Sequence, residues 1–153
     1  MQLYGGAQQV LYLLAGLRQR GVENLLACPQ DSEIAHRASG DAEVIALPMR
    51  GDTDLALVPR LRRVIGDRRP DLVHLHSRRG ADLLGGLAAR SAGVPSILSR
   101  RVDNPEPRLW VAMKYRLFVH VITISEGIRA VLLREGLPPD KVTCVHSAVD
   151  PVS

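Results

Sequence analysis

The sequence has few cysteines and few aromatic residues, and it contains no long hydrophobic run. Cys28 and Cys144 lie in apolar segments, where buried free thiols of a reducing compartment are expected rather than a disulfide or a metal site. No apolar stretch approaches the roughly 18–20 residues of a membrane-spanning helix, and no secretory signal is evident. Aromatic residues make up 3% of the chain, which disfavours binding of single-stranded nucleic acid by base stacking. We therefore expect a cytoplasmic protein.

Lysine is also scarce, because only Lys114 and Lys141 are lysines among 20 basic residues. The net charge is +4, and 46% of the residues are hydrophobic, which suits one globular domain with a core of its own. Arginine attracts phosphate on a nucleotide, a lipid headgroup or nucleic acid. The same bias also follows from a GC-rich genome and solvated helix faces, so only arginines at strand ends are interpreted as candidate ligand contacts.

Apolar segments of strand length alternate with amphipathic segments of helix length along the whole chain. The expected strands are residues 24–28, 43–47, 72–76, 95–99, 119–124 and 142–145. The expected helices are residues 7–20, 32–39, a segment that ends near 66, 81–92, a segment around 109–117, and 125–135. This alternation predicts an α/β fold, with a doubly wound, Rossmann-like, mostly parallel sheet and helices on both faces. Trp110 and Met113 are predicted as helix core rather than as a platform on which a sugar stacks.

A doubly wound domain normally has a strand before its first helix, and residues 1–4 are too few and too mixed to form one. We therefore predict a sheet that is incomplete at its N-terminal strand. The strands at 24–28 and 72–76 would lose a backbone partner, which predicts a gap, a re-paired strand, or self-association through the incomplete sheet.

Polar and cationic side chains follow two apolar strands where each strand ends. The segment at 72–76 ends in His76 and is followed by Arg78 and Arg79, and the segment at 95–99 is followed by Arg100 and Arg101. Ligands of open parallel sheets bind beyond the carboxyl ends of the strands. The sequence therefore predicts a ligand site at this edge of the sheet.

His74 and His76 are two residues apart, so both side chains lie on the same side of a strand. Two ligands do not make a metal site, and the sequence offers no clear third or fourth, so no metal is expected. His74 is expected to be satisfied within the sheet. A neutral imidazole at His76 can donate a hydrogen bond to a hydroxyl group.

Three sequence segments, in this order, resemble the N-terminal domain of family-four (group-one) retaining glycosyltransferases of the two-domain GT-B type. They are GGAQ at 5–8, PDLVHLHS at 70–77, and ITISE at 122–126 followed by KV at 141–142 and AVD at 148–150. The resemblance implies transfer of a sugar from a nucleotide-sugar to a hydroxyl acceptor with retention, in envelope polysaccharide or lipopolysaccharide synthesis. It also implies a domain at 1–146, the start of an interdomain linker at 147–153, and a donor-binding domain beyond this chain.

The resemblance assigns a role to several residues. Gly5 and Gly6 would face the donor diphosphate, which suits a glycine turn at the start of a helix. His76 would reach the donor sugar or the reacting centre, and Ser125 and Glu126 would form the family's motif before the hinge helix. Ser125 also suits a helix N-cap without any such role. No cofactor is implied, because the nucleotide-sugar is a substrate.

The arginines at the strand ends would recognise a phosphorylated, acidic or lipid-linked acceptor. This set comprises Arg78, Arg79, Arg100 and Arg101. The family often has His-Asp after the fifth strand, whereas this chain has RRVD at 100–103, which puts the usual donor contact there in doubt. The alternative is that these are surface arginines on loops.

The predicted partners are therefore the nucleotide-sugar, such an acceptor, and the inner face of the membrane as a peripheral contact, with no nucleic acid. Two other functions remain open. One is a non-catalytic doubly wound module that binds anionic ligands or nucleic acid through its arginines. The other is a nucleotide-sugar epimerase of related architecture.

Overall fold

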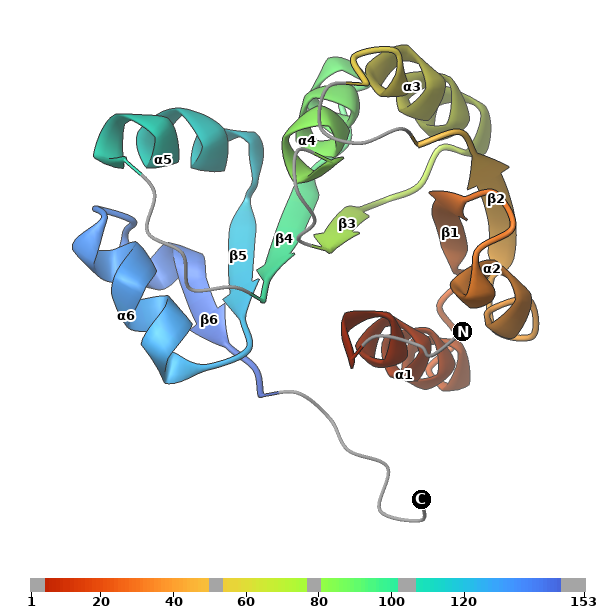
Figure 1. Cartoon of the computed structure of the whole chain (residues 1–153), viewed down its shortest axis with the longest axis horizontal. Coiled ribbons are helices and arrows are strands. Elements are labelled where there is room, and N and C mark those ends of the chain that lie inside the picture. The colour runs from red at the N-terminus through yellow and green to blue at the C-terminus, as the bar shows by residue number, and fades with distance from the viewer. Residues whose placement is uncertain (1–4, 50–53, 77–80, 102–106, 147–153) are drawn as a thin grey trace. The chain divides into compact units, whose positions relative to one another are not determined.

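The computed structural model describes residues 5–49, 54–76, 81–101 and 107–146 (Figure 1). The chain divides into two compact units, of which one comprises Met1–Arg50 with Ser147–Ser153 and the other Gly51–His146. Each unit is described by itself. No helix in the described ranges is both long enough and apolar enough to cross a bilayer.

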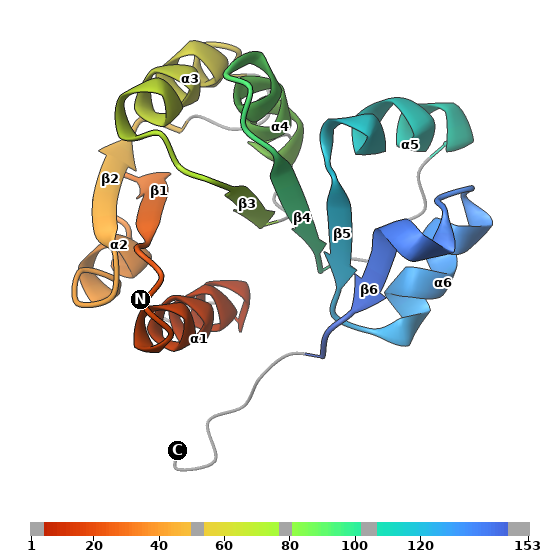
Figure 2. The same cartoon turned by 180° about the vertical axis from the view of Figure 1, so that it is seen from behind.

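The first unit is a two-stranded parallel sheet with two helices. Its elements are α1 (Gly5–Gln19), β1 (Leu25–Pro29), α2 (Glu33–Arg37) and β2 (Glu43–Leu47), and β1 and β2 lie side by side (Figures 1 and 2). Val10 and Leu14 of α1 pack with Ala38, as the predicted apolar stripe requires. The Asn24 side chain donates hydrogen bonds to the carbonyl oxygens of Leu14, at 2.9 Å, and Asp41, at 3.1 Å.

The second unit is a four-stranded parallel sheet in the order β3-β4-β5-β6. Its strands are β3 (Val73–His76), β4 (Ser96–Arg100), β5 (His120–Thr123) and β6 (Val142–Cys144). Its helices are α3 (Leu57–Arg68), α4 (Ala81–Ser91), α5 (Arg108–Lys114) with the short 3₁₀ turn η1 (Tyr115–Leu117), α6 (Glu126–Arg134) and the 3₁₀ turn η2 (Pro139–Lys141). Pro59 falls in the first turn of α3, where its missing N–H costs no helical hydrogen bond. The α/β class with parallel strands flanked by helices is thus confirmed.

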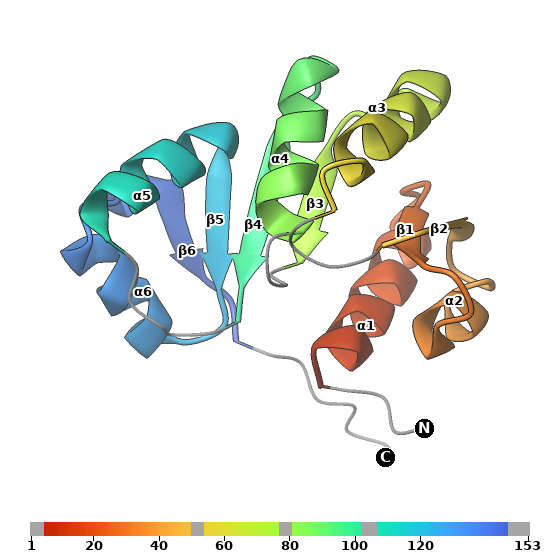
Figure 3. The same cartoon turned by 45° about the horizontal axis from the view of Figure 1, so that its top comes forward.

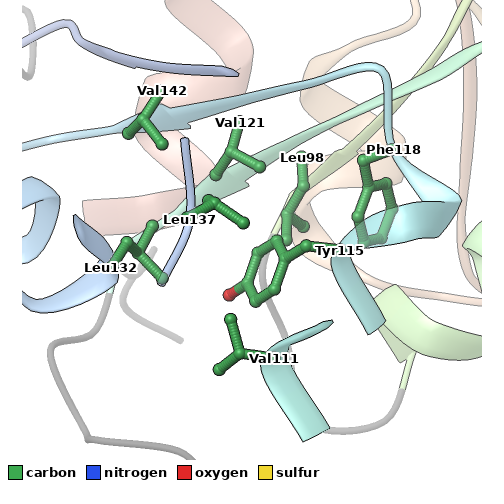
Figure 4. Packing of buried hydrophobic residues seen from close by; sticks show 8 residues of the cluster. All are labelled: Leu98, Val111, Tyr115, Phe118, Val121, Leu132, Leu137 and Val142. Atoms are coloured by element: carbon green, nitrogen blue, oxygen red, sulfur yellow. The ribbon is translucent and has the colours of Figure 1, made fainter. Parts of the chain in front are cut away.

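One face of this sheet is covered by helices α4, α5 and α6 (Figure 3). A row of paired residues, Leu75, Leu98, Val121 and Val142, crosses the sheet on this face. Side chains from η1 and α6 pack on the row, so that the cluster in Figure 4 forms the main core. Parallel strands that follow each other in chain order place their right-handed crossovers on a single face. Side chains alternate along a strand, so the His76 row lies on the opposite face.

The small residues of α4 let it approach the sheet closely, as predicted. A Cβ at Gly85 would collide with the side chain of Leu75, and one at Gly86 would lie 3.1 Å from the ring of Phe118. Ala88 and Ala89 are completely buried, in a cluster that includes Ile65 of α3. These contacts explain why this helix carries four small residues on its inner side.

The prediction that Trp110 and Met113 form the buried core of α5 is wrong. Trp110 and Met113 are 41% and 60% exposed, whereas Val111, Tyr115 and Phe118 are buried. Both sets are apolar and both recur at helical spacing, so the sequence alone supports either register. The buried set is the one that packs against Leu98 and its neighbours on the sheet.

The strands form two separate sheets rather than one. Among the described residues of its own unit, β3 pairs only with β4. The prediction of an incomplete sheet stays a prediction, because residues 1–4 lie outside the described ranges.

Candidate active site at the carboxyl ends of β3 and β4

The parallel register brings two of the predicted site residues to the same edge of the sheet. His76 is the last residue of β3 and pairs with Ser99 of β4, and Arg101 follows the end of β4. Ser99 and Arg101 are two residues apart, as His74 and His76 are, so the four positions share one face. Alternation along the two strands is therefore sufficient to gather this cluster, which we call the histidine edge: His74, His76, Ser99 and Arg101.

The side chains of the histidine edge contact one another directly. The imidazole rings of His74 and His76 stack with their centroids 4.2 Å apart and an interplanar angle of 25°. Nε2 of His74 lies 2.7 Å from the hydroxyl of Ser99, and an Nη2 proton of Arg101 is donated to Nδ1 of His76 over 3.4 Å. Nε of Arg101 is buried without a hydrogen-bond partner in the described part of the chain.

Both histidines are neutral at neutral pH. Burial, the adjacent His74 and the positive charge of Arg101 together lower the pKa of His76 to about 3, with burial the largest cause. Burial and the Arg101 charge together lower the pKa of His74 to about 4. The pKa of Arg101 is itself lowered by burial. A neutral imidazole that resists protonation is suited to donate a hydrogen bond and unsuited to act as a general base near pH 7.

Arg100, the last residue of β4, and Arg101, which follows it, make separate contacts. Arg100 is only 3% exposed, and its Nη1 donates a hydrogen bond to the hydroxyl of Tyr115 at 2.9 Å. The carboxylate of Glu135 lies 3.9 Å from the same nitrogen. These contacts favour a structural role for Arg100 over the predicted acceptor contact, because the guanidinium is already enclosed by its own domain.

At the end of β5, Ser125 serves as the N-cap of α6. Its hydroxyl accepts a hydrogen bond from the backbone N–H of Ile128 at 3.1 Å, and its carbonyl accepts one from Thr123 at 3.1 Å. Glu126 is exposed in the first turn of α6, where a carboxylate is favoured by the helix dipole. The predicted cap is confirmed, while a functional role for Ser125 and Glu126 stays a prediction.

The family model for Glycosyltransferase Family 4 matches residues 4–152. The chain belongs to this family. Among solved structures, HepE (Alr3699) of Anabaena in complex with UDP is similar at 13% identity with a TM-score of 0.74, over 97% of this chain and 42% of that one. A glycosyltransferase from Rickettsia africae is 15% identical with a TM-score of 0.74, over 92% of this chain and 38% of that one. MnaA of S. aureus with UDP is 17% identical with a TM-score of 0.67, over 92% of this chain and 42% of that one.

At these identities the likeness concerns the fold. The chain spans about two fifths of the length of the Anabaena and Rickettsia proteins, at 42% and 38%. No curated protein matches this sequence.

Other residues that the family resemblance singles out are placed differently. Gly5 and Gly6 are the first residues of α1 in the first unit, so the helix begins two residues earlier than predicted. Arg78 and Arg79 lie outside the described residues. The roles of these four residues in the glycosyltransferase therefore stay predictions.

Two polar interactions in this family-four domain were not identified from the sequence. Ser99, which anchors His74, is the residue before the end of β4 in an ordinary apolar segment, although its position two residues before Arg101 is a usable signal. Asp82 and Lys114 form a buried ion pair at 3.0 Å between α4 and α5, and their sequence separation gives no local signal.

The histidine edge is distinct from the two surface hollows described for this chain. A hollow of about 390 Å³ lies at the amino ends of β1 and β2, near Asn24 and Asp41, and one of about 270 Å³ lies beside α5, near Tyr115 and Lys141. Ligands of parallel sheets bind at the carboxyl ends of the strands. We therefore take the histidine edge, rather than either hollow, as the candidate active site. In the described ranges, no group of three or more His, Cys, Asp or Glu residues is arranged to hold a metal ion.

Proposed function

We propose that this chain is the acceptor-side domain of a glycosyltransferase that transfers a sugar from a nucleotide-sugar to a hydroxyl acceptor with retention. The observation that carries the proposal is a neutral His76 at the carboxyl end of β3, in a chain that matches Glycosyltransferase Family 4. A second domain would bind the nucleotide. Solved structures of similar fold contain UDP or UDP-glucose, so a uridine nucleotide-sugar is the first donor to test.

His76 would hydrogen-bond a hydroxyl of the donor sugar as the glycosidic bond breaks. With a pKa of about 3 the ring is a weak base, so its contribution is a fixed donor aimed at the reacting sugar. Gly5 and Gly6, at the N-terminus of α1, would approach the donor diphosphate, since that helix end presents free N–H groups.

The acceptor would be phosphorylated, acidic or lipid-linked, as in envelope polysaccharide or lipopolysaccharide synthesis. Arg101 supports this role, because its half-buried guanidinium lies at the carboxyl edge with one buried nitrogen unpartnered within the described residues. Arg78 and Arg79 follow β3 directly and would add to the same positive potential.

The exposed face of α5 would place the domain on an anionic lipid surface on the cytoplasmic side of a membrane. Leu109, Trp110 and Met113 are 75%, 41% and 60% exposed, and Arg108 and Arg116 are exposed beside them. An apolar helix face with tryptophan and flanking arginines matches the chemistry of a bilayer interface with negative headgroups.

The transfer activity is tested by comparing the full-length gene product with the 153-residue chain. We expect the full-length product to release UDP and form a glycoside from a UDP-sugar and a hydroxyl acceptor, and we expect the 153-residue chain to form none. Turnover by the chain alone would contradict the two-domain proposal. An epimerised nucleotide-sugar would instead indicate an epimerase, and tight salt-dependent binding without turnover would indicate a binding module.

A further inference from the structure

The contact between Arg101 and His76 determines where the proton of the imidazole sits. A guanidinium group has five N–H donors and no acceptor. Nη2 of Arg101 lies 3.4 Å from Nδ1 of His76 with hydrogen-bonding geometry, so Nδ1 must be the acceptor and carry no proton. In a neutral imidazole, the proton is then on Nε2.

The surroundings also hold the ring in place. The ring of His76 stacks on His74, and His74 is anchored by the hydroxyl of Ser99, which is only 5% exposed. Stacking restrains rotation of the His76 ring, and the two ring nitrogens point in different directions. With Nδ1 occupied by Arg101, Nε2–H is the nitrogen left to meet a ligand.

We propose that Arg101 is a positioning residue that holds His76 as the Nε2–H tautomer, so that Nε2 donates a hydrogen bond to a hydroxyl of the substrate. The identity of that substrate rests on the proposed glycosyltransferase function, whereas the tautomer does not. This role differs from the acceptor contact that the sequence predicts for Arg101, because here the arginine acts through the histidine.

The tautomer is measured by long-range ¹H–¹⁵N correlation spectra of the 153-residue protein with ¹⁵N-labelled histidine at pH 7, using His76→Gln for assignment. We expect the Nε2–H form of His76 to exceed the Nδ1–H form by about tenfold or more, because a charge-assisted hydrogen bond favours the acceptor form of Nδ1. In Arg101→Gln this excess should fall about tenfold. Arg63→Gln, on the exposed side of α3, is the matched control and should leave the spectrum of His76 unchanged.

Two results would overturn the proposal. One is a wild-type spectrum in which Nδ1–H predominates, and the other is an unchanged His76 tautomer in Arg101→Gln. If Arg101→Gln does not fold, Arg101→Lys replaces it. An undiminished excess of the Nε2–H form in Arg101→Lys would show that the planar guanidinium group of Arg101 does not hold the tautomer. In the full-length gene product, Arg101→Gln should lower kcat about tenfold, and loss of the proposed acceptor contact of Arg101 would appear separately as a rise in KM. A wild-type gene product without transfer activity would refute the glycosyltransferase proposal and leave the tautomer result standing.

Discussion

At the carboxyl end of β4, neighbouring residues have opposite surroundings because strand side chains alternate. Arg100 lies on the helix-covered face and bonds to Tyr115, while Arg101 lies on the face of His76. The pairs His74–His76 and Ser99–Arg101 are brought together by the same alternation. A site of four side chains thus follows from two strands and their register.

The neutral histidines predict how stability depends on pH. The pKa values of His74 and His76 in the folded protein are about 4 and about 3, below the value of about 6.5 in an unfolded chain. The unfolded state therefore binds more protons than the folded state below about pH 6.5, so stability falls with falling pH. The contribution of the two neutral rings is complete above that pH and is lost progressively down to about pH 3. Urea unfolding at pH 7.5, 6.5, 5.5 and 4.5 measures this decline.

The double variant His74→Gln/His76→Gln isolates these two groups from the carboxylates that also titrate at low pH. We expect the free energy of unfolding of this variant to decline less steeply between pH 6.5 and 4.5 than that of the wild type. Arg63→Gln, an exposed substitution on α3, should keep the wild-type slope. Equal slopes for the double variant and the wild type would show that the histidines are not held neutral by the fold.

Much of the histidine edge was predictable from the sequence, because it depends on the spacing of residues within a strand and on the order of neighbouring strands. The shared face of His74 and His76 follows from their spacing, and the adjacency of β3 and β4 ends follows from the parallel sheet. The partner of Arg100 was not predictable, because Tyr115 lies 15 residues away on a helical turn whose orientation depends on packing. The anchoring of His74 by Ser99 spans 25 residues and depends on the pairing of β3 with β4.

Among the elements, α5 shows why a helical apolar pattern does not by itself identify the buried face. Residues 109–118 carry two apolar stripes, and the one that contacts the strands contains Val111, Tyr115 and Phe118. The other stripe, with Trp110 and Met113, remains exposed. The stripe that becomes buried is the one that fits the sheet row containing Leu98. That row lies on other elements, so the sequence of the helix alone does not identify the buried stripe.

The exposed stripe makes a prediction for membrane binding. The double variant Trp110→Ser/Met113→Ser should bind vesicles of phosphatidylglycerol and phosphatidylcholine at least about tenfold more weakly than the wild type. The reason is that each substitution removes apolar surface that the bilayer would bury. Co-sedimentation over a range of lipid concentrations gives the affinity. Pure phosphatidylcholine should bind the wild type more weakly, since Arg108 and Arg116 then lack negative headgroups.

Leu55→Ser is the matched control, because Leu55 is 73% exposed and lies outside α5, just before α3. It should leave vesicle binding unchanged. Equal weakening by Leu55→Ser and by the double variant would indicate non-specific adsorption. Unchanged binding of the double variant would show that this stripe does not contact lipid.

At the scale of the whole molecule, each of the two units contains a parallel sheet, β1-β2 or β3–β6, and the family match extends over residues 4–152. The alternation of strands and helices predicted the α/β class with parallel strands. The inward register of α5 and the partners of Arg100 required the packed structure. The glycosyltransferase proposal links the residue His76 to the whole enzyme, because it requires His76 to contact a sugar that a second domain binds.

The most direct test compares two histidines of the same sheet face in the full-length gene product. His76 ends β3, whereas His120 begins β5 and pairs its Nε2 with Thr143 at 2.6 Å, at the other end of the strands. His76→Gln should lower kcat for sugar transfer about 100-fold, the usual cost of losing one donor aimed at the reacting group, while His120→Gln should change it by less than about twofold. A His76→Gln enzyme with wild-type kcat, or an equal loss in both variants, would contradict the placement of the reaction at this edge.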